Sequence, residues 1–142
     1  MTGYLLDTNI VSELRKPPSR RSAELNTWAK SLNEQQAYLS VITVAEVERG
    51  VLLLERKDPR QAEVLRAWFE SVILKVYAER IIPLDIAVAR RAAALQVPDP
   101  HPFADALIAA TAIEHGLVLV TRNVKDFRGT GVDFINPWEA LS

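Results

Sequence analysis

Short apolar segments alternate with longer segments of helical periodicity along the whole chain. Buried strands are predicted where apolar residues are continuous, and amphipathic helices where they recur every three or four positions. The predicted strands are residues 4–6, 37–40, 81–84, 117–120 and 132–135. The predicted helices are residues 10–14, 22–32, 43–54, 59–76, 85–95 and 103–115, and Gly116 stops the last of them.

Strands that are short, apolar and separated by helices are typical of a parallel sheet covered on both faces. We therefore predict an α/β fold with a short central parallel β-sheet flanked by helices on both faces. Ligands of such sheets bind at the carboxyl ends of the strands. Attention falls on the residues that follow Leu6, Ser40 and Val120, and on the helix that starts near Asp105.

Length and composition narrow the class of protein. The chain has 142 residues without repeats or linkers, so we expect one domain over residues 1–142. It contains no cysteine, which excludes disulfides, thiolate metal sites and cysteine nucleophiles. No apolar run is long enough to cross a bilayer, and we expect a cytoplasmic protein. A net charge of −1 disfavours a general nucleic-acid coating protein but permits a nuclease.

Two acids near the expected sheet edge have a structural and a functional interpretation. Asp7 follows the first strand, where it either caps the helix that begins near Asn9 or projects into the crevice. Glu46 lies three residues after Thr43, which is the spacing of a capping box. The same glutamate is one turn from the edge that Asp7 occupies, so it is also a candidate ligand.

Asp105 lies in the first turn of an alanine-rich helix. The helix dipole stabilises an acid there by roughly 0.3–1 kcal/mol, which is an ordinary reason for an aspartate. Its neighbours are almost wholly apolar, however, and a partly buried carboxylate needs a proton or a cation. Three acids in one crevice repel one another, and a divalent cation bound by hard oxygen ligands offsets that repulsion. Mg²⁺ or Mn²⁺ suits such a site.

A fourth candidate follows the strand that ends at Val120. Asp126 would supply another carboxylate, whereas Asn123 is nearer the strand and would contact a metal-bound water or a phosphate through its amide. Thr121 and Arg122 are candidate phosphate contacts, although a surface arginine is usually just solvated. Arg15, Lys16, Arg20 and Arg21 are further cations that would balance an acidic centre.

Together these segments resemble the PIN-domain family. The resemblance rests on residues 5–9 (Leu-Leu-Asp-Thr-Asn), 40–46 (Ser-Val-Ile-Thr-Val-Ala-Glu), 105–112 and 121–123 (Thr-Arg-Asn). Within that family the chain is similar to VapC-type toxins, especially the FitB-like branch, whose tails carry a segment like Asn136-Pro137-Trp138. FitB-like relatives can have aspartate where this chain has Asn123, and Asp126 is then the substitute.

The resemblance implies a metal-dependent endoribonuclease toxin of a type II toxin–antitoxin pair. It implies a homodimer that binds RNA as substrate and a cognate antitoxin as inhibitor, with DNA reached only through the antitoxin. The expected catalytic residues are Asp7, Glu46, Asp105 and Asp126, of which Asp7, Asp105 and Glu46 hold Mg²⁺ or Mn²⁺. The expected substrate contacts are Thr8, Asn9, Thr121, Arg122 and Asn123.

Other chemistry lacks a motif. There is no nucleophile elbow, P-loop or dinucleotide fingerprint, and we assign no catalytic role to His101 or His115. The alternative function is a non-catalytic, DNA-associated regulatory partner that uses the PIN-like fold as a dimer scaffold. For the antitoxin, we expect a groove between the helices at residues 22–32 and 43–54.

Overall fold

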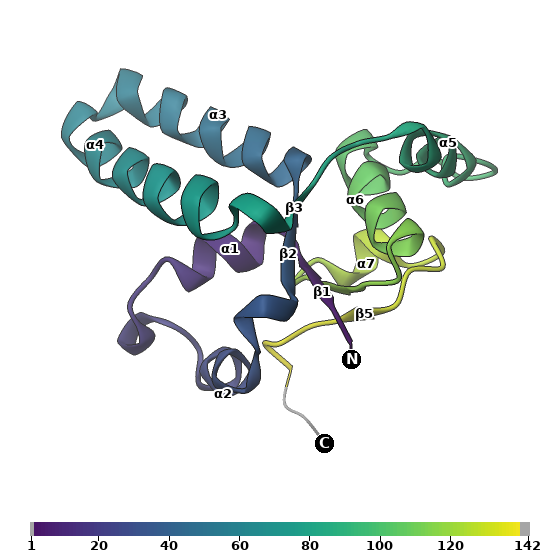
Figure 1. Cartoon of the computed structure of the whole chain (residues 1–142), viewed down its shortest axis with the longest axis horizontal. Helices are drawn as coiled ribbons and strands as arrows, with labels where there is room; N and C mark the ends of the chain where they lie inside the picture. Colours follow the sequence, from purple (N-terminus) through teal and green to yellow (C-terminus); the bar gives the residue numbers. More distant parts are fainter. Residues whose placement is uncertain (1, 140–142) are drawn as a thin grey trace.

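A five-stranded parallel sheet forms the centre of the computed structural model, which describes residues 2–139 (Figure 1). Its spatial order is β3-β2-β1-β4-β5. The strands are β1 (Tyr4–Leu6), β2 (Ala37–Ser40), β3 (Ile81–Ile82), β4 (Val118–Val120) and β5 (Phe134–Ile135), and every pair is parallel. The predicted parallel α/β fold is therefore confirmed.

The order of the sheet reverses between β1 and β4. From β1 the chain builds β2 and β3 on one side, then returns to add β4 and β5 on the other. Leu6 of β1 is in register with Val120 of β4, so the two strands end side by side. A crevice at the carboxyl ends of two such strands is the usual ligand site of an open parallel sheet, because their connections leave in opposite directions.

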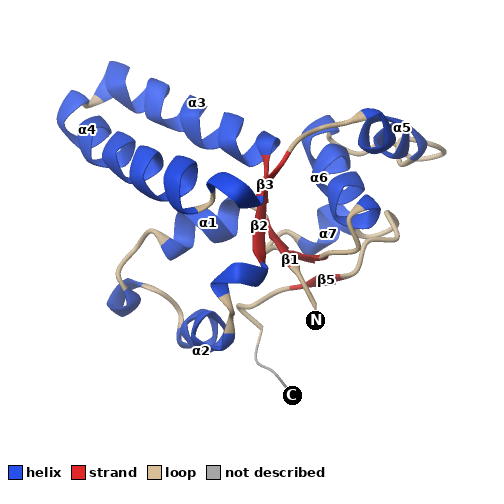
Figure 2. Ribbon diagram, in the orientation of Figure 1, coloured by secondary structure: helices blue, strands red, loops and turns tan. Residues whose placement is uncertain are grey.

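Helices cover both faces of the sheet (Figure 2). One face carries α1 (Thr8–Leu14), α2 (Ala23–Ser31), α3 (Val41–Lys57), α4 (Pro59–Trp68) and a π-helical continuation, Phe69–Val76. The other carries α5 (Ile86–Ala94), α6 (Phe103–Glu114) and α7 (Val124–Phe127). Leu6 packs in the first core and its neighbour Leu5 in the second, as the alternation of side chains along a strand requires.

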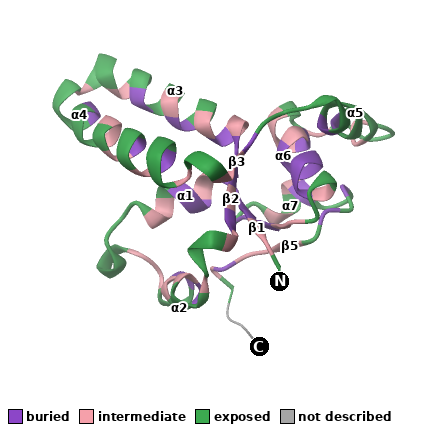
Figure 3. Cartoon of the chain, in the orientation of Figure 1, coloured by how far each residue is buried: buried purple, intermediate pink, exposed green. Residues whose placement is uncertain are grey.

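Burial follows the same layering (Figure 3). α6 is buried along most of its length, because it packs on the sheet with one side and on α5 with another. Gly116 ends this helix with a φ of 63°, as its position in the sequence predicted. Within residues 2–139, no helix is long and apolar enough to span a membrane.

The predicted element boundaries need several corrections. α3 begins at Val41 rather than Thr43, because Ser40 caps it by accepting a hydrogen bond from the Ile42 N–H (3.0 Å). β3 stops at Ile82, before Pro83, which cannot donate to a neighbouring strand. β5 begins at Phe134 rather than at residue 132. The sequence pattern did not predict α7 or three short 3-10 turns, which are Pro18–Arg20, Glu34–Gln36 and Ala78–Arg80.

Candidate active site

Asp7 is fixed at the point where β1 and β4 end. Its backbone N–H donates to the carbonyl of Val120 (2.9 Å), and its side chain is 6% exposed. Oδ1 accepts the Thr8 N–H (2.8 Å), while Oδ2 accepts the Thr121 hydroxyl (2.8 Å) and the Asn9 amide (3.1 Å). Asp7 is thus the residue that caps α1, and its carboxylate also faces the end of β4.

Burial raises the pKa of Asp7, and the charge of Glu46 raises it further. Hydrogen bonds from Thr121, Thr8 and Asn9 act in the opposite direction, because each stabilises the carboxylate form. The balance is still a raised pKa, which means that this carboxylate carries its charge at a cost.

Asn9 and Thr121 join the loop after β4 to Asp7. Asn9 Nδ2 also approaches the Thr121 hydroxyl oxygen (3.4 Å), and its Oδ1 accepts the Arg122 N–H (3.2 Å). Thr121 is fully buried, and its hydroxyl oxygen accepts the Asn123 N–H (3.1 Å). These side chains are directed at Asp7, so a contact between them and RNA stays a prediction.

Glu46 lies in the second turn of α3 and contacts α1. Its Oε1 accepts the Thr8 hydroxyl at 2.7 Å, and the Thr8 oxygen lies 3.1 Å from the Thr43 hydroxyl. The capping-box interpretation of Thr43 and Glu46 is wrong, because Ser40 is the cap of α3. Glu46 is therefore not needed to start the helix and is directed toward the residues that follow β1.

The pKa of Asp105 depends on the other three acids. Its pKa is raised to about 6, chiefly by partial burial and then by the charges of Asp7, Asp126 and Glu46, in that order. Such interactions require proximity, so the fold brings the four acids predicted from the sequence to one region. They come from the end of β1, from α3, from α6 and from α7.

The two candidates for the fourth position of the site, Asp126 and Asn123, differ in exposure. Asp126 lies in the first turn of α7 and is partly buried, whereas Asn123 immediately precedes α7 and is exposed. Asp126 acts on the pKa of Asp105, while Glu46 is the acid that acts on the pKa of Asp7. Asp105 is the acid whose pKa is raised by all three of the others.

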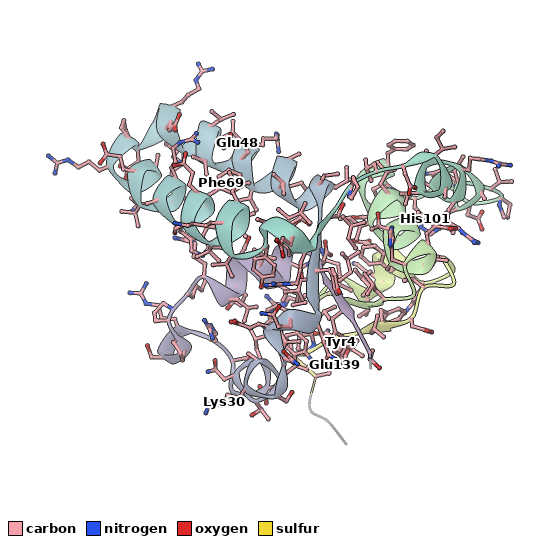
Figure 4. All side chains as sticks on the ribbon, in the orientation of Figure 1. Tyr4, Lys30, Glu48, Phe69, His101 and Glu139 are labelled. Atoms are coloured by element: carbon pink, nitrogen blue, oxygen red, sulfur yellow. The ribbon has the colours of Figure 1, made fainter. Side chains whose placement is uncertain are left out.

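His101 also acts on Asp105, although the sequence indicated no catalytic role for this histidine. Its charge lowers the pKa of Asp105, and its backbone N–H donates to Gln96 Oε1 (2.7 Å). Figure 4 labels it beside α6. Its position four residues before Asp105 was the available signal, but the prolines around it suggested only an exposed turn.

The basic residues of the N-terminal third have contacts of their own, and Lys16 pairs with Glu13. Arg15 and Lys16 follow the end of α1, and the Arg15 guanidinium lies over Trp68. Arg21 is engaged by the carbonyls of Leu14 and Lys16. A balance between these cations and the acids stays a prediction.

The donor chemistry of the acidic edge fits a divalent cation. All four acids offer the hard oxygen ligands that Mg²⁺ and Mn²⁺ prefer. Burial and then the neighbouring acids raise the pKa of Asp105, and a bound cation would offset both effects. Within residues 2–139, no three Asp, Glu or His side chains are grouped closely enough to hold a metal ion, and Glu46 is instead bound by Thr8. The fit thus rests on charge and ligand type.

Comparison with known proteins identifies a family and relatives that match nearly the whole chain. The PIN domain family model matches residues 4–132. The chain is 40% identical over 140 residues to toxin FitB of Neisseria gonorrhoeae, covering 94% of this chain and 97% of the relative. It is 34% identical over 140 residues to the VapC ribonuclease Y4jK of Sinorhizobium fredii, covering 95% and 97%.

Solved structures are similar over the same length. The structure of FitAB bound to an IR36 DNA fragment superimposes with a TM-score of 0.87 at 35% identity, covering 98% of each chain. A toxin–antitoxin complex from Klebsiella pneumoniae superimposes with a TM-score of 0.68 at 30% identity, covering 97% of this chain and 100% of that one.

Proposed function

Because this chain belongs to the PIN-domain family, we propose that it is a metal-dependent endoribonuclease and the toxin of a type II toxin–antitoxin pair. The observation that carries the proposal is the geometry at the carboxyl end of β1, where Thr8 donates hydrogen bonds to both Asp7 and Glu46. The pKa of Asp105, raised by burial and by the charges of Asp7, Asp126 and Glu46, supports it. A structural acid at a helix N-terminus would not need three other carboxylates beside it. A centre that binds a cation and a phosphodiester needs several carboxylates close together.

Asp7, Asp105 and Glu46 would hold Mg²⁺ or Mn²⁺. When bound, the ion supplies a water of lowered pKa and offsets the negative charge that develops on the phosphate oxygens. The residues around Asp7 keep that carboxylate in one orientation, because Thr8, Asn9 and Thr121 all donate to it. Such partners of a ligand typically contribute ten- to a hundred-fold to metal affinity or activity, at order of magnitude.

Thr8 performs a second task through its side chain. Its hydroxyl holds Glu46 Oε1 at 2.7 Å, so the acid from α3 stays beside the end of β1. We propose that Asp126 completes the site from α7, because it is one of the three carboxylates whose charge raises the pKa of Asp105. Asn123 is too exposed to serve as a carboxylate substitute and carries no charge.

The proposal is tested by Asp7→Asn, which keeps the shape of the side chain and removes its charge. Cleavage of a structured RNA in Mg²⁺ or Mn²⁺ should fall to background while the circular dichroism spectrum is unchanged. Asp133→Asn is the matched control, since Asp133 is exposed and precedes β5 at the opposite edge of the sheet. Retention of wild-type cleavage by Asp7→Asn contradicts the proposal.

The alternative, a non-catalytic DNA-associated partner, predicts no metal response. The enzyme instead predicts that Mn²⁺ raises the melting temperature of the wild-type chain and not that of Asp7→Asn, since binding to the folded state alone stabilises it. The DNA-bound relative contains FitAB as an assembly, and we propose that DNA is reached here only through the antitoxin.

A cleft whose lining is mostly apolar, with Arg21 and Glu34 among the lining residues, suits the antitoxin. It has a volume of about 300 Å³ and lies between α1, α2 and the π-helical segment, with Leu14, Ala29, Leu32, Trp68 and Val76 among its lining residues. Ala29 and Leu32 of α2 line this cleft, whereas Val47 and Val51 of α3 are buried in the core. The predicted groove between α2 and α3 stays a prediction. We propose that an amphipathic antitoxin segment fills this cleft, and that two copies of the chain form a homodimer, which sedimentation would measure.

A further inference from the structure

Arg122 is anchored at the acidic edge by its backbone and free of carboxylate partners. Its N–H donates to Asn9 Oδ1, and Asn9 in turn donates to Asp7. The side chain is exposed, and no ion pair among residues 2–139 involves it. Instead, the guanidinium lies over the indole ring of Trp138, with 4.9 Å between its Cζ and the ring centroid.

Trp138 is held firmly enough to act as a support. Its ring is partly buried against the core that α1 and α2 share with the sheet. Its backbone N–H donates to Asn136 Oδ1 (2.9 Å). Pro137 beside it is buried. The tail reaches this position because β5 pairs with β4, where the Thr121 N–H donates to the carbonyl of Ile135 (3.0 Å). Figure 4 labels Glu139, the next residue of the tail.

We propose that Trp138 is a positioning residue that holds Arg122 as a preset contact for a phosphate of single-stranded RNA beside the acids. The inference rests on the proposed ribonuclease function and adds to it a residue from the tail. Neither a sequence motif nor a charge pattern indicated this pairing, because the two residues are sixteen positions apart and meet only through β5.

The physical case begins with repulsion. An RNA phosphate that approaches four carboxylates is repelled unless a cation lies nearby, and Arg122 is the arginine that follows directly on the loop bound to Asp7. An unsupported arginine on the surface would lose side-chain freedom on binding a phosphate. Contact with an aromatic face restricts the guanidinium beforehand and leaves its edge N–H groups for phosphate oxygens.

The measurement is the binding of a fluorescent single-stranded RNA by anisotropy, across a series of KCl concentrations. The full chain carries Asp7→Asn and the buffer contains EDTA, so cleavage does not interfere. Arg122→Ala should weaken binding about five- to ten-fold and reduce the slope of log K against log salt by about 0.7, the value for one phosphate contact on a single strand. Arg56→Ala, far along α3 from the sheet edge, should change neither.

Trp138→Leu should weaken binding by about two- to five-fold, the range of an exposed cation–π contact. Trp138→Phe should restore it, because the aromatic face remains, and a melting temperature for each variant reports on the fold. The double variant Arg122→Ala/Trp138→Leu should bind no more weakly than Arg122→Ala alone, because Trp138 acts only through Arg122.

Two results overturn the inference: an unchanged salt slope in Arg122→Ala, or additive losses in the double variant. Either can occur while Asp7→Asn still abolishes cleavage, in which case the proposed function stands without this contact. Conversely, cleavage that persists in Asp7→Asn contradicts the proposed function, whatever the RNA-binding variants do.

Discussion

The buried hydroxyl of Thr121 donates a 2.8 Å hydrogen bond to Oδ2 of Asp7, and it joins the ends of two strands whose residues are 114 positions apart in sequence. Thr121 begins the loop after β4, and Asp7 follows β1 directly. The bond therefore lies where the sheet order reverses, and it sets the orientation of the most buried of the four acids.

Thr121→Val removes this hydrogen bond and preserves the shape of the side chain. We expect cleavage to fall about ten- to a hundred-fold, because one oxygen of Asp7 loses a partner that orients it. The free energy of unfolding should fall by about 1–2 kcal/mol. Thr121→Ser should recover most of the activity; if Val and Ser variants cleave equally, Thr121 has no orienting role.

Glu46→Gln separates the two interpretations of that residue. Ser40 is the cap of α3, and glutamine can still accept the Thr8 hydroxyl, so the free energy of unfolding should change by less than about 0.5 kcal/mol. Cleavage should nevertheless fall about ten-fold or more, because a charged ligand is lost. Ser40→Ala is the comparison, with an expected cost of about 1 kcal/mol from the lost cap. If Glu46→Gln lowers the free energy of unfolding as much as Ser40→Ala does, Glu46 has a capping role.

Asp105 makes the metal-free protein sensitive to pH. The pKa of Asp105 is raised from 3.8 to about 6 by burial and by neighbouring acids, so the folded chain binds this proton more tightly than the unfolded chain does. The resulting stabilisation is fully present below about pH 4 and is lost as the pH rises through about 6. At pH 7.5 without metal, Asp105 therefore opposes folding.

Asp105→Asn should raise the melting temperature of the metal-free chain at pH 7.5 and abolish the increase that Mn²⁺ causes in the wild type. The stabilisation should be about 1 kcal/mol after allowance for solvent screening. Thermal unfolding in EDTA at pH 5.0 and pH 7.5 measures it, and the advantage of the variant should shrink at the lower pH. An advantage of equal size at both pH values would remove the electrostatic explanation.

The sequence predicted the layers and the acids because both follow from local patterns. Continuous apolar runs and helical periodicity placed β1, β4 and α6, and the rule for strand ends pointed to Asp7. The link between Thr8 and Glu46 was not predictable, since it depends on how α1 packs beside α3. The start of α3 was missed because Ser40 and Thr43 are both good caps, and only the end of β2 decides between them.

The fourth position can be decided by substitution. We expect Asp126→Asn to lower cleavage more than Asn123→Ala does, because only Asp126 carries a charge that acts on Asp105. Cleavage across a Mn²⁺ titration measures this, and Asp126→Asn should need more Mn²⁺ for half-maximal activity. An unchanged Mn²⁺ dependence would exclude Asp126 from the site.

We expect the antitoxin to inhibit RNA cleavage only if it binds in the cleft beside α2. Ala29 lines it and is partly exposed, so Ala29→Glu places a further charge in a cleft that an antitoxin segment would cover, while α2 remains intact. We expect the variant to cleave RNA like the wild type and to stop growth even when the cognate antitoxin is co-expressed.

Thr27→Glu introduces the same side chain on the exposed side of the same helix and outside the cleft, so the antitoxin should still neutralise it. Growth of cells that co-express each variant with the antitoxin, together with co-purification of the two proteins, measures the difference. Neutralisation of Ala29→Glu as complete as that of Thr27→Glu would mean that the antitoxin binds elsewhere. In that case the cleft has no part in inhibition, although cleavage lost in Asp7→Asn would still identify the chain as a ribonuclease.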